Sequence, residues 1–345
     1  MKRVLYTLII SASIVSLCFA GNPDRQGESG AGELLLNPWA KSAGLHSMTT
    51  SFASGVEALR LNPAGIGRLS GREIYFGNTR LYEGSTLQHN AVGYAQRGKG
   101  NGAFGFSLAI LDFGEIAITT EDQPEGTGGF YSPSFVNLGL GYSYTYENKI
   151  SVGILTRLIS ETLPSLTAFG LAVDAGVQYV SGDRDNFKLG ISLRNIGTPM
   201  RFSGEGLSRQ VIINPDQDPR KFDSRAEGFE LPSVLNIGFS YDFYLREDIF
   251  IRGLANFTSN AFSRDQIGGG AELHFRNLVT LRGGYKYEVG SLSAAVTNIY
   301  TGASGGITIN VPVRKESNTK LGLDYAYRTT NPYRGTHNFG VRLSF

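Results

Sequence analysis

The chain has 345 residues, a formal net charge of +2 and a hydrophobic content of 41%. This near-neutral charge, with no basic patch carrying interleaved aromatic residues, excludes an electrostatic case for a nucleic-acid partner. The 45 glycines, 21 phenylalanines and 17 tyrosines with a single cysteine exclude a disulfide-rich scaffold and fit a β-barrel. A secreted β-sandwich could have the same composition.

Residues 1–20 have the pattern of a secretory signal peptide. Lys2 and Arg3 precede a largely apolar stretch over residues 4–19, and Ala20 offers a small-residue cleavage site. Lipid attachment at Cys18 is disfavoured because Leu17 stands where a small residue is needed. Cleavage after Ala20 would remove the only cysteine and two positive charges, so the mature chain would have zero net charge and no disulfide.

Residues 21–69 predict an N-terminal extension that differs from the rest of the chain. Residues 21–37 are polar and glycine-rich, and residues 38–69 are apolar without clean two-residue alternation. We expect short helices or turns here, up to the turn formed by Asn62, Pro63, Ala64 and Gly65. Asn62 suits a helix or turn cap and Pro63 fixes the backbone, although these residues could instead gate a passage.

From residue 70 to residue 345 the dominant pattern is alternation. In residues 136–146 one set of alternate positions carries Val, Leu and Tyr, and the other carries Asn, Gly, Ser and Thr. Successive strand residues point to opposite faces, so such a strand has one apolar and one small, polar face. The pattern predicts strands over residues 72–81, 87–97, 102–113, 134–146, 149–160, 166–180, 186–197, 232–246, 248–258, 265–276, 278–288, 302–312, 318–328 and 335–345.

The connectors between these strands favour a barrel over a sandwich. Short connectors near residues 98–101 and 147–148 alternate with longer ones such as 114–133 and 198–231, although the first long-side connector, 82–86, is short. Outer-membrane barrels sort their loops in this way, and an even strand number leaves both ends on the periplasmic side. Closure is required because an open sheet edge cannot face hydrocarbon. We therefore expect an all-β fold, a 14-stranded antiparallel transmembrane β-barrel, with residues 21–69 as a lumen plug.

The last predicted strand carries Phe339, Val341, Leu343 and Phe345 on one face. A terminal strand that ends in an aromatic residue resembles the signal read by outer-membrane barrel assembly machinery. We therefore interpret Phe345 as an assembly signal, the alternative being an ordinary last strand.

Catalytic and metal sites find little support in the sequence. The four histidines His46, His89, His274 and His337 form no metal-spaced pair. No serine lies in a nucleophile-elbow context, and the glycine run at residues 268–270 follows no strand-to-helix pattern. We expect no enzyme activity, no metal and no cofactor.

The N-terminal block resembles the signature of the PorV/PorQ family, within the wider FadL-like group of fourteen-stranded outer-membrane barrels. The matching segments are KSAGL at residues 41–45, SGVEAL at 54–59 and NPAGI at 62–66. The resemblance implies a subunit of the type IX secretion system. Such a subunit binds a large translocon channel protein and the C-terminal signal domains of secreted proteins. FadL-like proteins instead move fatty acids and other hydrophobic molecules.

Two functional hypotheses follow, with a barrel enzyme as a weaker third. The first is a PorV-like binding subunit for protein export. The second is a FadL-like channel for hydrophobic small molecules, with an apolar pocket between plug and wall and a lateral opening. Both place the protein in the outer membrane of a Gram-negative bacterium, surrounded by outer-membrane lipid.

Overall fold

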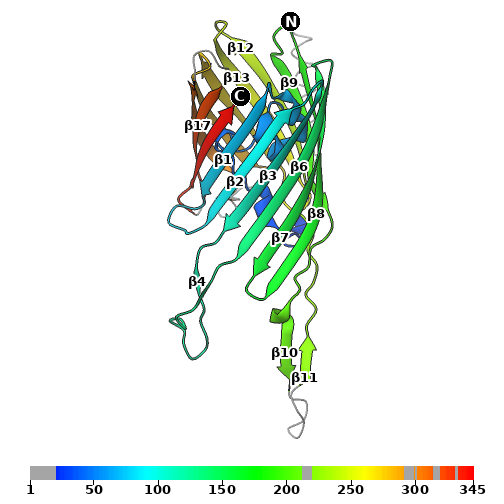
Figure 1. Ribbon diagram of the computed structural model, residues 1–345, viewed down its shortest axis with the longest axis vertical. Coiled ribbons are helices and arrows are strands. Elements are labelled where there is room, and N and C mark those ends of the chain that lie inside the picture. Colours follow the sequence, from blue (N-terminus) through cyan, green and yellow to red (C-terminus); the bar gives the residue numbers. More distant parts are fainter. Residues whose placement is uncertain (1–20, 212–219, 291–298, 300, 314–318, 331–332) are drawn as a thin grey trace.

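The protein is a closed antiparallel barrel of fourteen strands (Figure 1). The computed structural model describes residues 21–211, 220–290, 299, 301–313, 319–330 and 333–345, so the predicted signal peptide lies outside the described residues. The barrel strands are β1 (Arg72–Arg80), β2 (Gln88–Arg97), β3 (Gly102–Asp112), β6 (Ser134–Tyr146), β7 (Ile150–Leu163), β8 (Leu166–Ser181), β9 (Phe187–Gly197), β12 (Val234–Tyr244), β13 (Ile249–Asn260), β14 (Gln266–Phe275), β15 (Val279–Glu288), β16 (Gly302–Pro312), β17 (Lys320–Arg328) and β18 (Thr336–Ser344). Each of these strands lies on one of the predicted ranges, which confirms the predicted fold class.

The seam of the barrel joins β1 to β18. Their pairing runs from Glu73 opposite Ser344 to Arg80 opposite His337. Beyond the last pair, the Arg72 amide donates to the Phe345 carbonyl oxygen at 2.7 Å. Because every strand then has two neighbours, the wall has no free edge, as a lipid environment requires.

The two faces of the wall follow the two-residue period. On β6, Leu140 and Tyr142 point outward and are 57% and 53% exposed. Asn137 and Ser143 point into the lumen and are buried. The apolar outer face and the polar inner face predicted from the sequence are both confirmed.

The two ends of the barrel differ in the length of their connectors. One end carries short turns, and the other carries two hairpins that extend well beyond the wall (Figure 1). These hairpins are β4 (Ile116–Ala117) with β5 (Phe130–Tyr131), and β10 (Ser208–Val211) with β11 (Arg220–Asp223), preceded by η5 (Glu205–Leu207). Outer-membrane barrels have short periplasmic turns and long extracellular loops, so the hairpin end is extracellular. The short strands of these two hairpins were not predicted from the sequence.

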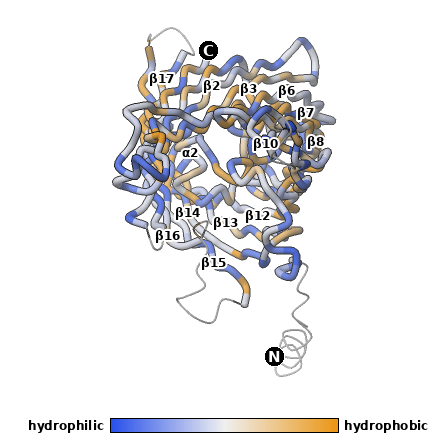
Figure 2. Tube along the Cα trace, turned by 90° about the horizontal axis from the view of Figure 1, so that it is seen from below, coloured by the Kyte–Doolittle hydropathy of each residue, from blue (hydrophilic) through white to orange (hydrophobic). Residues whose placement is uncertain are grey.

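The N-terminal extension fills the lumen with short helical turns, as predicted. They are η1 (Pro23–Arg25), η2 (Gly32–Leu35), α2 (Ala40–Ala43), η3 (Gly55–Glu57), α3 (Ala58–Leu61) and η4 (Pro63–Arg68). Seen along the barrel, α2 lies inside the ring of strands (Figure 2). Within the described part of the chain, none of the helices has the length and apolarity needed to span a membrane.

The plug is held by an apolar core against one side of the wall. Trp39, Val56, Leu59 and Ile66 are buried in one cluster with Leu155 of β7. The ring of Trp39 also stacks on Tyr75 of β1, with ring centroids 5.0 Å apart. Burying side chains of this size contributes about 1.5–3 kcal/mol each, so the plug is an integral part of the fold.

Candidate functional site in the barrel lumen

The Asn62 side chain anchors the plug to the wall. Its Oδ1 accepts a hydrogen bond from the Ala64 amide at 3.2 Å, which caps η4, while Pro63 occupies the first position of that turn. Its Nδ2 donates to the carbonyl oxygens of Thr50 at 2.9 Å and of Val177 at 3.1 Å. Asn62 therefore links two parts of the plug to β8 and is completely buried. These contacts agree with the capping role predicted for it.

Glycines in the wall leave the space that this anchor occupies. A Cβ atom added to Gly176 would lie 2.0 Å from Asn62 Oδ1, and one added to Gly153 would lie 2.3 Å from the Pro63 carbonyl carbon. A Cβ atom at Gly190 would lie 2.3 Å from the Thr50 carbonyl oxygen. The close approach of the plug backbone to β7, β8 and β9 thus requires glycine at these positions.

The pairing between β8 and β9 is irregular beside the plug. The register shifts between Val173 and Ala175, so Asp174 faces two residues of β9. Asn195 adopts the left-handed conformation with φ of 61°, and its amide donates to Asp174 Oδ1 at 2.7 Å. The other carboxylate oxygen of Asp174 accepts from Arg157 at 2.7 Å. This β-bulge interrupts the ladder and is stabilised by a buried ion pair.

A second charged network lines the periplasmic half of the adjoining wall, on β12 to β15. Arg252 contacts Asp242 at 2.6 Å and Glu272 at 3.3 Å, and Arg282 contacts Glu272 at 3.0 Å. The Arg252 guanidinium also lies over the ring of Phe52 in the plug, with its Cζ atom 4.5 Å from the ring centroid. The charges of this network are therefore balanced by direct ion pairs.

The extracellular half of the lumen contains a cavity of about 230 Å³ between the plug and the wall. Among the described residues, its lining includes three basic side chains, no carboxylate and several apolar side chains. The cations are Arg194, Lys286 and Arg328, and the apolar members are Leu35, Leu61, Pro232, Val234 and Phe262. The cavity therefore combines basic and apolar side chains, and Arg194 is the cross-strand neighbour of Val234.

His46 of the plug also lines this cavity. Its Nε2 lies 3.2 Å from the Ala303 carbonyl oxygen. Burial lowers the pKa of His46 to about 3, and the nearby charges of Arg328 and Lys286 act in the same direction. The imidazole is therefore neutral at neutral pH and adds no positive charge to the cavity.

The predicted site residues divide between two places. Asn62, Pro63, Ala64 and Gly65 lie together at the plug–wall contact, and Phe345 lies at the periplasmic end of the seam, far along the wall. Lys286 was missed, although alternation in residues 278–288 places it on the face opposite Leu281, Tyr285 and Tyr287. Among the described residues, no group of His, Cys, Asp and Glu has an arrangement that could hold a metal ion.

No sequence family matches this chain, and no curated protein matches it. Its fold, however, matches solved barrels. The Pseudomonas putida toluene transporter TodX aligns with a TM-score of 0.56 and 15% identity, over 89% of this chain and 97% of TodX. The monoaromatic hydrocarbon channel CymD has a TM-score of 0.52 and 12% identity, with 90% and 98% covered.

A Pseudomonas aeruginosa FadL homologue aligns with a TM-score of 0.50 and 12% identity, over 89% of this chain and 98% of its own. At these identities the likeness concerns the fold. Together with the closed wall and the plug, it gives the chain a FadL-like barrel fold and an outer-membrane location.

Proposed function

We propose that this protein is a FadL-like channel that takes up small amphipathic molecules with an anionic head. The single observation that carries the proposal is the cavity between the plug and the wall. Its cations Arg194, Lys286 and Arg328 suit a carboxylate, and Leu61, with the other apolar residues, suits an alkyl chain. Ligand sites commonly combine an apolar lining with a few placed polar groups. TodX and CymD, which share the fold, are named for uncharged hydrocarbons, so they support only the apolar part of the proposed substrate.

The position of the cavity suggests the route. It lies at the extracellular end, where a ligand would enter, and the plug closes the lumen below it. Onward movement then requires displacement of the plug or an exit through the wall. The bulge at Asp174 is a point where the ladder is already interrupted, so an opening there would break fewer strand hydrogen bonds.

The test compares two ligands of equal chain length, decanoate and decanol, by equilibrium binding to the barrel in nanodiscs. Decanoate should bind at least tenfold more tightly than decanol, because a hydrogen bond to a charged group contributes about 1.5–3 kcal/mol. Lys286→Gln should weaken that preference without abolishing it, because Arg194 and Arg328 remain. Lys149→Gln, on a periplasmic turn where Lys149 pairs with Asp185, should leave it unchanged. Equal binding of the two ligands by the wild-type barrel would overturn the proposal.

A second candidate is the PorV-like secretion subunit. The hairpins β4–β5 and β10–β11 favour it, because they extend beyond the wall where a partner could contact them (Figure 1). Affinity isolation from outer membranes would then recover a large translocon protein and exported clients. Intact secretion in a deletion strain, with decanoate binding as above, would reject this candidate.

A further inference from the structure

The outer wall carries a groove of about 440 Å³ across β18, β1, β2 and β3. Its floor and sides are mostly apolar and include Phe76, Val92, Leu108 and Val341. Phe76 is 56% exposed on the lipid-facing side. The groove therefore lies at the level of lipid acyl chains. It is outside the lumen and separate from the cavity between the plug and the wall.

The groove becomes polar toward the extracellular end. β1 runs from Arg72 at the periplasmic end to Arg80 at the extracellular end, so Asn78 lies on the extracellular side of Phe76. The Asn78 Nδ2 donates to Asn90 Oδ1 of β2 at 2.6 Å and to Gln88 Oε1 at 3.3 Å. Three amide side chains thus face outward where the neighbouring groove is apolar.

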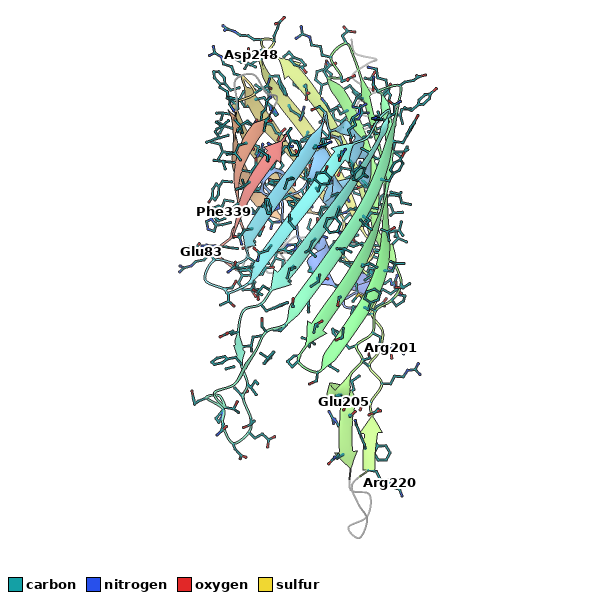
Figure 3. All side chains as sticks on the ribbon, viewed as in Figure 1. Glu83, Arg201, Glu205, Arg220, Asp248 and Phe339 are labelled. Atoms are coloured by element: carbon teal, nitrogen blue, oxygen red, sulfur yellow. The ribbon has the colours of Figure 1, made fainter. Side chains whose placement is uncertain are left out.

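The cationic side chain of Arg80 lies on the extracellular side of these amides. Arg80 is exposed, and its guanidinium lies over the ring of Phe339 with 5.9 Å to the centroid. Among the described residues it forms no salt bridge. Glu83 extends outward from the β1–β2 loop (Figure 3), and the Asp112 carboxylate on β3 accepts the Gly114 amide at 2.9 Å. Arg80 is therefore placed to meet a negative charge from outside the protein.

We propose that this groove is a binding site for a phosphate-bearing lipid of net negative charge in the outer leaflet. An outer-leaflet lipid points its head toward the extracellular side and its chains toward the bilayer centre, which is the order of groups along the groove. The acyl chain would lie along Phe76, Val92 and Val341, and the amides of Asn78 and Asn90 would meet the polar junction. Arg80 would contact the phosphate, since Arg forms strong charge-assisted hydrogen bonds with phosphate oxygens.

A second copy of this chain is the competing occupant. Amide side chains both donate and accept, so a copy could pair with them across a two-fold axis. The exposed Arg80 argues against it, because a two-fold arrangement would bring two guanidinium groups close together.

The experiment is native mass spectrometry of the purified protein in non-ionic detergent. Dioleoyl phosphatidylglycerol or dioleoyl phosphatidylcholine is added, and bound lipid is counted as collisional activation rises. The wild-type protein should retain the anionic lipid about tenfold more than the zwitterionic one. Arg80→Gln should lose this preference. Arg72→Gln is the matched control, because Arg72 lies on the same strand and over the ring of Phe345 at 6.0 Å, but at the other end.

Three outcomes would overturn the proposal. The first is equal retention of the two lipids by the wild-type protein, and the second is the same preference in all three proteins. The third is a dimer without bound lipid, which would assign the groove to a second copy. Heat-modifiability on gels confirms that each variant is a folded barrel, so a lost preference is not a lost fold.

Discussion

Replacing Asn62 by alanine should release the plug while the barrel remains closed. The substitution removes both amide hydrogens that bind the carbonyl oxygens of Thr50 and Val177, at 2.9 and 3.1 Å. At about 1 kcal/mol for each hydrogen bond, the loss is about 2 kcal/mol, or about 30-fold in the population of released plug. The buried Thr50 carbonyl is not orphaned, because Gln178 Nε2 also donates to it at 3.1 Å.

Limited trypsin digestion of the detergent-solubilised barrel measures this population, because the plug contains Lys41, Arg60 and Arg68. Where opening is fast relative to cleavage, the cutting rate follows the fraction of open molecules. Asn62→Ala should therefore be cut about 30-fold faster. Asn90→Ala is the control, since it removes an amide hydrogen bond on the outer face only. If Asn62→Ala is cut no faster than the wild type, the anchoring role of Asn62 is wrong.

Three further changes test the plug contact, the membrane face and the seam. Gly176→Ala should speed plug digestion, because the new Cβ atom would lie 2.0 Å from the amide oxygen that anchors the plug, whereas Gly283→Ala, with no atom closer than 3.7 Å, should not. Leu140→Arg, midway along β6, should cost about 2–4 kcal/mol and lower the yield of heat-modifiable barrel, and Tyr146→Arg at the strand end should cost only about 0–1 kcal/mol. Equal yields would contradict the assigned depth. Deletion of Phe345, whose backbone extends the seam, should reduce assembled barrel in membranes, and unchanged assembly would remove its assigned role.

Much of the fold could be predicted because a barrel strand repeats every two residues. Leu140 and Ser143 lie on opposite faces because side chains alternate along a single strand, whatever its neighbours are. The hairpin β4–β5 was missed because Ile116–Ala117 and Phe130–Tyr131 are too short for any period to show. The plug was predicted from the lack of alternation, together with a resemblance of its motif.

The candidate site was less predictable, because it depends on which strands meet the plug. Arg194, Lys286 and Arg328 come from three strands far apart in the sequence, and only closure of the barrel brings them to one cavity. The bulge at Asp174 is likewise a property of two strands, since the alternation within β8 continues through it. The set of basic residues on which the proposed ligand preference rests was therefore not visible in the sequence alone.

The path of the N-terminal extension has a consequence for biogenesis. Near its start, the Gly30 amide binds the Glu230 carbonyl oxygen at 3.0 Å at the extracellular rim, yet β1 begins with Arg72 at the periplasmic rim. The extension therefore runs through the full height of the barrel, from the extracellular to the periplasmic end, before β1 begins. β1 and β18, whose pairing closes the barrel, are its first and last strands in the sequence. Assembly therefore has to bring the extension into the lumen either before β1 pairs with β18 or through the periplasmic end of the closed barrel.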